Sequence, residues 1–176
     1  MHRLRIRWAW RRLRRLLPGY RAPHPPPLVL WVLTAEQFGL LRPHLEALAR
    51  RWGAGGQRWL ILQNEARSKP PPSSFERYVL PPQQRCWDGG LGDEALRWLE
   101  ASASRWGICL EPSVSPAAAE ALLRSGALWR VALSTPALEE VVDLVWQIRE
   151  DDPEHVTRQM ARYADWVRGF GGVGSA

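Results

Sequence analysis

The polar residues best placed to bind a ligand lie in the stretch EPSVSPAAAEALLRSG, residues 111 to 126. Ser113 and Ser115 precede a predicted helix that begins near Pro116, and Glu120 follows one turn later. Free backbone N–H groups at a helix N-terminus can bind a phosphate or another anion. The same residues also make an ordinary strand-to-helix connection in which a serine caps the helix. The residues alone leave both interpretations open.

Cysteine and histidine chemistry is not indicated elsewhere in the chain. Cys86 and Cys109 are the only cysteines, and their spacing matches neither a disulfide framework nor a zinc site. This usage fits a reducing cytoplasm. The four histidines are scattered, form no HExxH pair and have no neighbouring nucleophile: His2, His24, His44 and His155. These residues therefore identify no catalytic group, and catalytic residues stay unassigned; we predict no metal site and expect no cofactor.

Short apolar runs alternate with helical patterns along most of the chain. Strands are predicted for the runs at 28–33, 57–63, 76–80, 107–111 and 128–133. Helices are predicted at 35–52, 93–105, from 116 onward, 136–150 and 153–168. Thr34 and Gln37 match a capping box at the start of the first of these helices. A long polar loop is predicted at 64–75.

The alternation of strands and helices predicts the fold class. The strands are too continuously apolar to face water, so they indicate a parallel sheet covered on both faces. We expect an α/β fold, a single Rossmann-like domain with about five mainly parallel strands and helices on both faces. Ligands of such sheets bind at the carboxyl ends of the strands, where residues 111 to 126 begin.

The net charge of +6 belongs to the N-terminus and not to the domain. Eight of the 24 basic residues precede residue 22, and the first acidic residue is Glu36. The remaining chain carries 16 basic and 18 acidic residues, so it is close to neutral. The predicted organisation is a basic amphipathic helix at 1–21, a proline-rich linker at 22–27, the domain at 28–170 and a flexible tail at 171–176.

The basic helix carries apolar residues on one face and arginines around most of the remainder. It has too few apolar residues to span a membrane, but its amphipathic pattern suits the interface of an anionic membrane. Packing on the domain, a disordered arm, a nonspecific RNA contact and a transit peptide stay open as alternatives. The expected location is the cytoplasm, with peripheral attachment to the inner face of the membrane. The residues expected at an anionic surface are Arg3, Arg5, Arg7, Trp8, Trp10, Arg11, Arg12, Arg14 and Arg15.

The segment WLEASASRWGICLEPSVSPAAAEALLRSGALWRVALS resembles the C-terminal lobe of GT-B glycosyltransferases of the group 1 type. The shared order is a helix, a strand ending in Pro-Ser, a Glu-Ala helix, a glycine and a valine-rich strand. The final segment, with its Asp-Pro at 152–153, is similar to the last helices of that family. The resemblance spans about residues 28–170, and its specific part is 98–153. The matched positions are Pro112, Ser113, Glu120, Ala121 and Gly126.

The resemblance implies that this lobe binds the nucleotide of a nucleotide sugar and that Glu120 contacts the ribose. Two features depart from the family pattern. Pro112 replaces an earlier glutamate, and LTAEQFG replaces the Gly-Arg and nearby lysine that bind the phosphates. A positive group at the diphosphate stabilises the departing charge in such a transfer. An enzyme of this type also needs a second lobe for the acceptor.

Three classes of function follow from these features. The first is a glycosyltransferase-like lobe that binds a nucleotide or nucleotide sugar and acts with a partner chain that supplies the second lobe. The second is an inactive, membrane-associated interaction module with the same fold. The third is a nonspecific nucleic-acid binder acting through the arginine-rich tail. It ranks last because no RNA-binding motif interleaves the aromatic residues with arginine.

Deletion of residues 1–21 should abolish binding to anionic vesicles, because it removes eight arginines and leaves a nearly neutral domain. Co-sedimentation with phosphatidylserine-containing vesicles measures this, and purely zwitterionic vesicles should bind both proteins poorly. Equal binding of the truncated and full-length proteins to anionic vesicles would contradict the assignment.

Overall fold

The computed structural model describes the central part of the chain. The described residues are 29–52, 57–63, 76–101, 104–133, 136–137, 139–146 and 159. The predicted basic helix with its arginines, the linker, the polar loop at 64–75 and the flexible tail lie outside them, as does the helix at 153–168 apart from Gln159.

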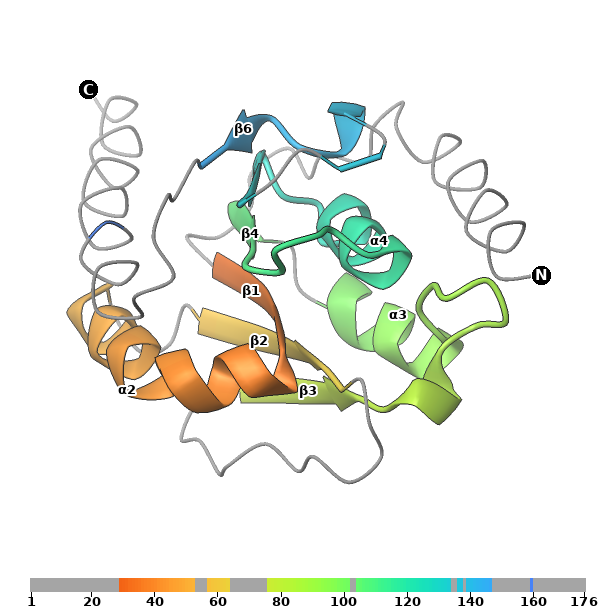
Figure 1. The fold of residues 1–176 in the computed structure, drawn as a ribbon, viewed down its shortest axis with the longest axis horizontal. Helices are drawn as coiled ribbons and strands as arrows, with labels where there is room; N and C mark the ends of the chain where they lie inside the picture. Colours follow the sequence, from red (N-terminus) through yellow and green to blue (C-terminus); the bar gives the residue numbers. More distant parts are fainter. Residues whose placement is uncertain are drawn as a thin grey trace.

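The described residues form one sheet of six parallel strands in the order β3-β2-β1-β4-β5-β6 (Figure 1). The strands are β1 (Val29–Thr34), β2 (Gln57–Leu62), β3 (Glu76–Leu80), β4 (Trp106–Cys109), β5 (Trp129–Ala132) and β6 (Leu144–Val145). All five predicted strands are present, with Leu30, Ile61, Val79, Ile108 and Val131 in β1 to β5. This is the strand order of doubly wound nucleotide-binding sheets. The predicted Rossmann-like α/β class is therefore confirmed.

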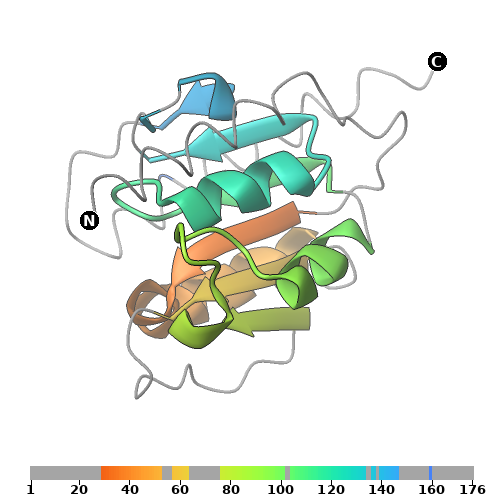
Figure 2. The same cartoon turned by 90° about the vertical axis from the view of Figure 1, so that its right-hand side faces the viewer.

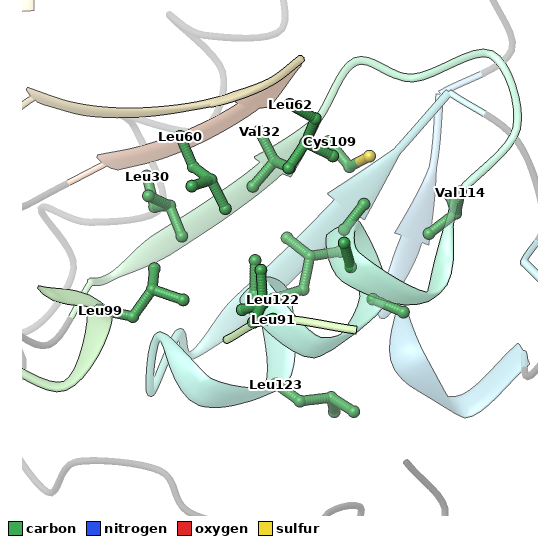
Figure 3. Packing of buried hydrophobic residues seen from close by; sticks show 14 of the residues in the cluster. Leu30, Val32, Leu60, Leu62, Leu91, Leu99, Cys109, Val114, Leu122 and Leu123 are labelled. Carbon is green, nitrogen blue, oxygen red and sulfur yellow. The ribbon is translucent and has the colours of Figure 1, made fainter. Parts of the chain in front are cut away.

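Helices cover both faces of the sheet, as Figure 2 shows most clearly. Because side chains alternate along a strand, Trp31 and Leu33 lie in the apolar cluster under α2 (Ala35–Trp52). Leu30 and Val32 lie in the cluster on the opposite face, under α3 (Asp93–Glu100) and α4 (Pro116–Arg124). Figure 3 shows Leu30 and Val32, together with Leu60, among the side chains of this cluster under α3 and α4. β1 is consequently buried on both sides.

The alanine-rich sequence of α4 allows it to pack close to the sheet. Its residues 117–119 are alanines with 0% exposure. The strand beneath has Gly107, where an added Cβ would lie 2.9 Å from Leu122 Cδ2. α4 ends before Gly126, which adopts a positive φ of 66° and stands where a left-handed residue commonly ends a helix. Small residues on both elements therefore fix the separation of α4 from β4.

The predicted capping box at the start of α2 is confirmed. The backbone N–H of Gln37 donates to Thr34 Oγ1 at 3.2 Å, and the backbone N–H of Thr34 donates to Gln37 Oε1 at 3.0 Å. Two amides at the helix start thus find acceptors. The helix begins directly where β1 ends, without an intervening loop.

The prediction of a helix at 136–150 is wrong for the residues of that range that the structure describes, 136–137 and 139–146. The chain there forms a short 3-10 helix, η3 (Glu139–Val141), followed by β6. Asp143 determines this geometry, because its carboxylate accepts hydrogen bonds from the backbone N–H and from the guanidinium of Arg130 on β5. The segment is therefore held beside β5, where Leu144 and Val145 add a sixth strand.

α3 ends at Glu100, five residues before the predicted end at Arg105. Ser104 and Arg105, which follow it and precede β4, bond instead to the segment that runs from the end of α4 into β5. The backbone N–H of Ser104 donates to Ser125 O at 2.9 Å, and the Arg105 carbonyl accepts from Leu128 and Trp129. These tertiary bonds replace the helical bonds that the sequence pattern predicted.

A buried arginine joins β2, β3 and α3. Arg58 is 2% exposed, and its guanidinium lies 3.8 Å from the ring centroid of Trp98. It donates to Glu76 Oε1 at 2.8 Å and to the Trp98 carbonyl at 2.6 Å. Charged residues are rarely buried without such partners. The charge thus fixes the position of α3 on the outer part of the sheet.

Substitution of Ile108 by Asp should unfold the domain. Ile108 is 0% exposed in β4, and the substitution loses about 1.5 to 3 kcal/mol of apolar burial and places a charge in the core. Circular dichroism and urea titration measure the effect. Leu40→Asp is the control, because Leu40 is 59% exposed on α2 and should tolerate the charge. A soluble Ile108→Asp protein that unfolds cooperatively would place this residue at the surface.

Candidate functional site

The strand order creates a switch point between β1 and β4. The chain leaves β1 toward α2 on one face of the sheet and leaves β4 toward α4 on the other face. The two connections diverge at the carboxyl ends of these neighbouring strands. Ligands of doubly wound sheets bind at such a point. The polar groups at this point therefore form a candidate binding site.

Glu111 lies two residues beyond β4 and interacts with the start of α4. Its Oε2 accepts hydrogen bonds from the Ser115 backbone N–H at 3.0 Å and from Ser115 Oγ at 2.8 Å. Ser115 is the N-cap of α4, and its Oγ also accepts from the Ala118 backbone N–H at 3.3 Å. A helix N-terminus attracts negative charge. The acidic group beside the start of α4 is therefore the side chain of Glu111, a residue of the same chain.

The charge state of Glu111 reflects opposing influences. Burial raises the pKa of its carboxyl group above the ordinary value, and the two hydrogen bonds from Ser115 and the positive charge of Arg85 oppose this rise. Burial also lowers the pKa of Arg85, and the charge of Glu111 opposes that shift. A buried carboxyl group and a partly buried guanidinium are thus electrostatically coupled near the switch point.

Arg85 reaches this edge from a hairpin that follows β3 and η2 (Pro82–Gln84). One of its guanidinium nitrogens, Nη2, donates to the Gln63 carbonyl at the end of β2, at 2.9 Å. The sequence LTAEQFG at the end of the first strand contains no basic residue that could bind phosphate. The structure brings a positive charge to the carboxyl edge from a different connection.

The hairpin, residues 85–91, is held by its own hydrogen bonds. Arg85 and Leu91 form an antiparallel bridge, and the Cys86 backbone N–H donates to the Gly90 carbonyl at 3.0 Å. The turn closes with the Gly89 N–H bonded to the Cys86 carbonyl at 2.9 Å. Gly89 has a φ of 88°, which favours glycine. In Figures 1 and 2 the connection from η2 to α3 runs beside α4.

The two sides of the switch point are also connected directly. Gln37, in the first turn of α2, donates from Nε2 to the carbonyl of Leu110, which immediately follows β4. Its Oε1 accepts from Thr34. One side chain therefore caps α2 and links it to the chain segment that carries Glu111.

The sequence-predicted ligand residues occupy three different environments. Ser113 is exposed in the loop before α4, and Ser115 is the helix cap. Glu120 is 0% exposed, and its Oε2 accepts from the Leu91 backbone N–H at 2.8 Å. Glu120 thus anchors the hairpin to α4 from the protein interior. The structure does not bring these three side chains together on one surface.

Glu111, Arg85 and the bridging contact of Gln37 are not among the site residues predicted from the sequence. Glu111 had a local signal, because it is the first charged residue after the apolar run of β4. The same residue also ends the strand predicted at 107–111. Arg85 had no such signal, since its position depends on how the hairpin folds over the sheet.

Comparisons with protein-family models, curated proteins and solved structures give no match for this chain. In the part of the chain that the structure describes, no helix combines the length and apolar character needed to cross a membrane. Within the same residues, histidine, cysteine and carboxylate side chains form no group of three that could hold a metal ion.

Glu111→Gln should change how stability depends on pH. Since burial raises the pKa above 4.5, the folded state holds this proton more tightly than the unfolded state. The contribution of Glu111 to the unfolding free energy therefore falls as pH rises from about 4.5 through the raised pKa, and then becomes constant. The glutamine variant lacks this contribution.

Urea unfolding at a series of pH values measures the difference in unfolding free energy between wild type and Glu111→Gln. We expect this difference to shift in favour of the variant as pH rises through that range. Glu100→Gln, on the exposed side of α3, controls for the loss of one acidic charge. A difference that shifts in favour of the wild type with rising pH would show a lowered pKa and contradict the assignment.

Proposed function

We propose that this chain is a nucleotide-binding lobe that takes a nucleoside diphosphate or nucleotide sugar at the carboxyl edge of its sheet. The observation that carries the proposal is the strand order 3-2-1-4-5-6, with Glu111 just beyond β4 at the switch point and Arg85 bonded to the carbonyl that follows β2 at the same edge of the sheet. Sheets of this order bind nucleotides at that point. The resemblance of residues 98–153 to a GT-B glycosyltransferase lobe supports the same ligand class.

The two charged residues suit different parts of such a ligand. Glu111 uses Oε2 for Ser115, and we assign Oε1 as the acceptor for a ribose hydroxyl. Hydrogen bonds to a charged group are worth about 1.5 to 3 kcal/mol. The guanidinium of Arg85 would attract the phosphates, for which arginine has a suitable planar set of donors.

Glu120 is assigned to structure in this proposal, because its carboxylate is buried on the Leu91 N–H. Its removal would leave that amide without this acceptor and would disturb the hairpin that carries Arg85. We further propose that sugar transfer requires a partner chain that supplies an acceptor-binding lobe. The nucleotide lobe alone would bind the donor without transferring it.

Titration calorimetry with uridine and guanosine diphosphates, and with their 2′- and 3′-deoxy analogues, tests the site. Wild type should bind at least one ribonucleotide about tenfold or more tightly than a deoxy analogue, as expected for one charge-assisted hydrogen bond. Glu111→Gln should reduce this ratio toward one. Any change in phosphate attraction affects both ligands equally and cancels in the ratio.

Arg85→Gln should weaken diphosphate binding about tenfold while leaving the ratio unchanged. Arg97→Gln, an exposed arginine of α3, is the matched control and should have little effect. Thermal unfolding of each variant verifies that it is folded. If wild type binds no nucleotide at millimolar concentration, residues 111–120 form only a capped connection and the proposal is wrong.

A further inference from the structure

The side chain of Gln37 interrupts the hydrogen bonding between β1 and β4 at their carboxyl ends. The strands pair in parallel with Val32 opposite Cys109, and the backbone N–H of Leu110 donates to the Val32 carbonyl at 2.8 Å. If this parallel ladder continued, the Leu110 carbonyl would accept from the N–H of Thr34, two residues beyond Val32. It accepts instead from Gln37 Nε2, while the Thr34 N–H donates to Gln37 Oε1 at 3.0 Å. One side-chain amide thus stands between two main-chain groups that would otherwise bond to each other.

A glutamine amide suits this position because it bonds to both main-chain groups. The Thr34 N–H needs an acceptor and the Leu110 carbonyl needs a donor, and the amide carries one of each. Glutamate, the usual alternative in a capping box, would accept from Thr34, but its carboxylate could not donate to Leu110. The bond to Leu110 is therefore not required for capping α2 and indicates a second role.

The inserted amide keeps the ends of β1 and β4 farther apart than a direct bond would, because two hydrogen bonds in series replace one. The Leu110 carbonyl belongs to the planar peptide unit that joins Leu110 to Glu111. Its bond to Gln37 therefore fixes the point from which Glu111 leaves the sheet. At the other end of this residue, Glu111 Oε2 accepts from the Ser115 N–H at 3.0 Å. Glu111 is thus held at its backbone from α2 and at its carboxylate by the start of α4.

We propose that Gln37 is a positioning residue of the nucleotide site: by separating the ends of β1 and β4, its amide places the Glu111 carboxylate where it can accept from the ribose. This inference rests on the proposed function and adds to it a residue of α2 that acts through Glu111. It implies that ribose recognition depends on a side chain whose own donor and acceptor bond to the main chain.

Gln37→Ala tests this role without any ligand. Loss of the amide lets the two main-chain groups approach each other, so Glu111 should shift and its bond to the Ser115 N–H should weaken. Hydrogen exchange followed by NMR should then show the Ser115 amide exchanging about tenfold faster than in wild type. The Ala119 amide, which donates to the Ser115 carbonyl at 2.9 Å, is the internal reference and should not change.

Two further variants separate positioning from capping. Thr34→Val removes the hydroxyl that accepts from the Gln37 N–H at 3.2 Å but leaves both bonds of the Gln37 amide, so exchange at Ser115 should stay as in wild type. Gln37→Glu keeps the acceptor for the Thr34 N–H and loses only the donor to Leu110, so it should accelerate exchange as Gln37→Ala does. Equal acceleration by Thr34→Val would show that Gln37 acts by capping α2, and the proposal would be wrong.

Calorimetry with uridine and guanosine diphosphates and their deoxy analogues connects this role to the nucleotide site. Gln37→Ala and Gln37→Glu should lower the ratio of ribonucleotide to deoxynucleotide affinity about threefold or more, because the shifted Glu111 carboxylate is a poorer acceptor for the ribose. The added charge of Gln37→Glu affects both ligands and cancels in the ratio. Thr34→Val should keep the ratio of wild type.

The outcomes distinguish this inference from the proposed function. If the Gln37 variants leave both the Ser115 exchange rate and the affinity ratio unchanged, the positioning role is wrong and the nucleotide site stands. Faster exchange with an unchanged ratio would also overturn a role of Gln37 in ribose recognition. If wild type binds no nucleotide, the proposed function is wrong; faster exchange in Gln37→Ala would still support the placement of Glu111 by Gln37, and unchanged exchange would overturn that as well.

Discussion

The burial of β1 constrains the rest of this structure. Its residues 29–33 are at most 6% exposed, and parallel neighbours occupy both of its edges. A strand in this position needs a helix on each face, so the connection after β1 and the connection after β4 must cover opposite faces of the sheet. The chain therefore turns in opposite directions at the carboxyl ends of these two strands. The switch point is therefore a consequence of covering the central strand.

The polar groups at the switch point are already organised by the protein. Glu111 bonds to the cap of α4, Gln37 bonds across to Leu110, and Arg85 bonds to the end of β2. A ligand at this position would meet side chains whose orientations are largely fixed, which lowers the entropic cost of binding. The same organisation limits the ligand, because one oxygen of Glu111 is committed to Ser115. The chain's own carboxylate also disfavours an anion directly at the start of α4.

The elements with strong local signals could be predicted from the sequence. The strands around Leu30, Ile61 and Ile108 each contain a run of consecutive apolar residues, and the Thr34–Gln37 cap has a recognisable spacing. The prediction of a helix at 136–150 fails because the contact of Asp143 with Arg130 is tertiary and leaves no periodic pattern in the sequence. That contact holds Leu144 and Val145 beside β5, where they form β6.

The candidate site was less predictable than the fold for the same reason. Ser115 was identified because a cap is a local feature, whereas the function suggested for Glu120 came from a resemblance and not from its surroundings. Only the folded hairpin shows that Glu120 faces the Leu91 amide. Residues from three separate connections meet at this edge, and their sequence spacing carries no information about their proximity.

The strand order also has a consequence for synthesis on the ribosome. β1, β2 and β3 can associate once the chain has emerged through Leu80, but the second edge of β1 pairs only with β4, which ends at Cys109. At about 5–20 residues per second, that edge stays open for a few seconds. An open, apolar strand edge readily pairs with other chains. The order in which the sheet is completed, and not the stability of the finished domain, sets the period in which a newly made molecule is most exposed to misassociation.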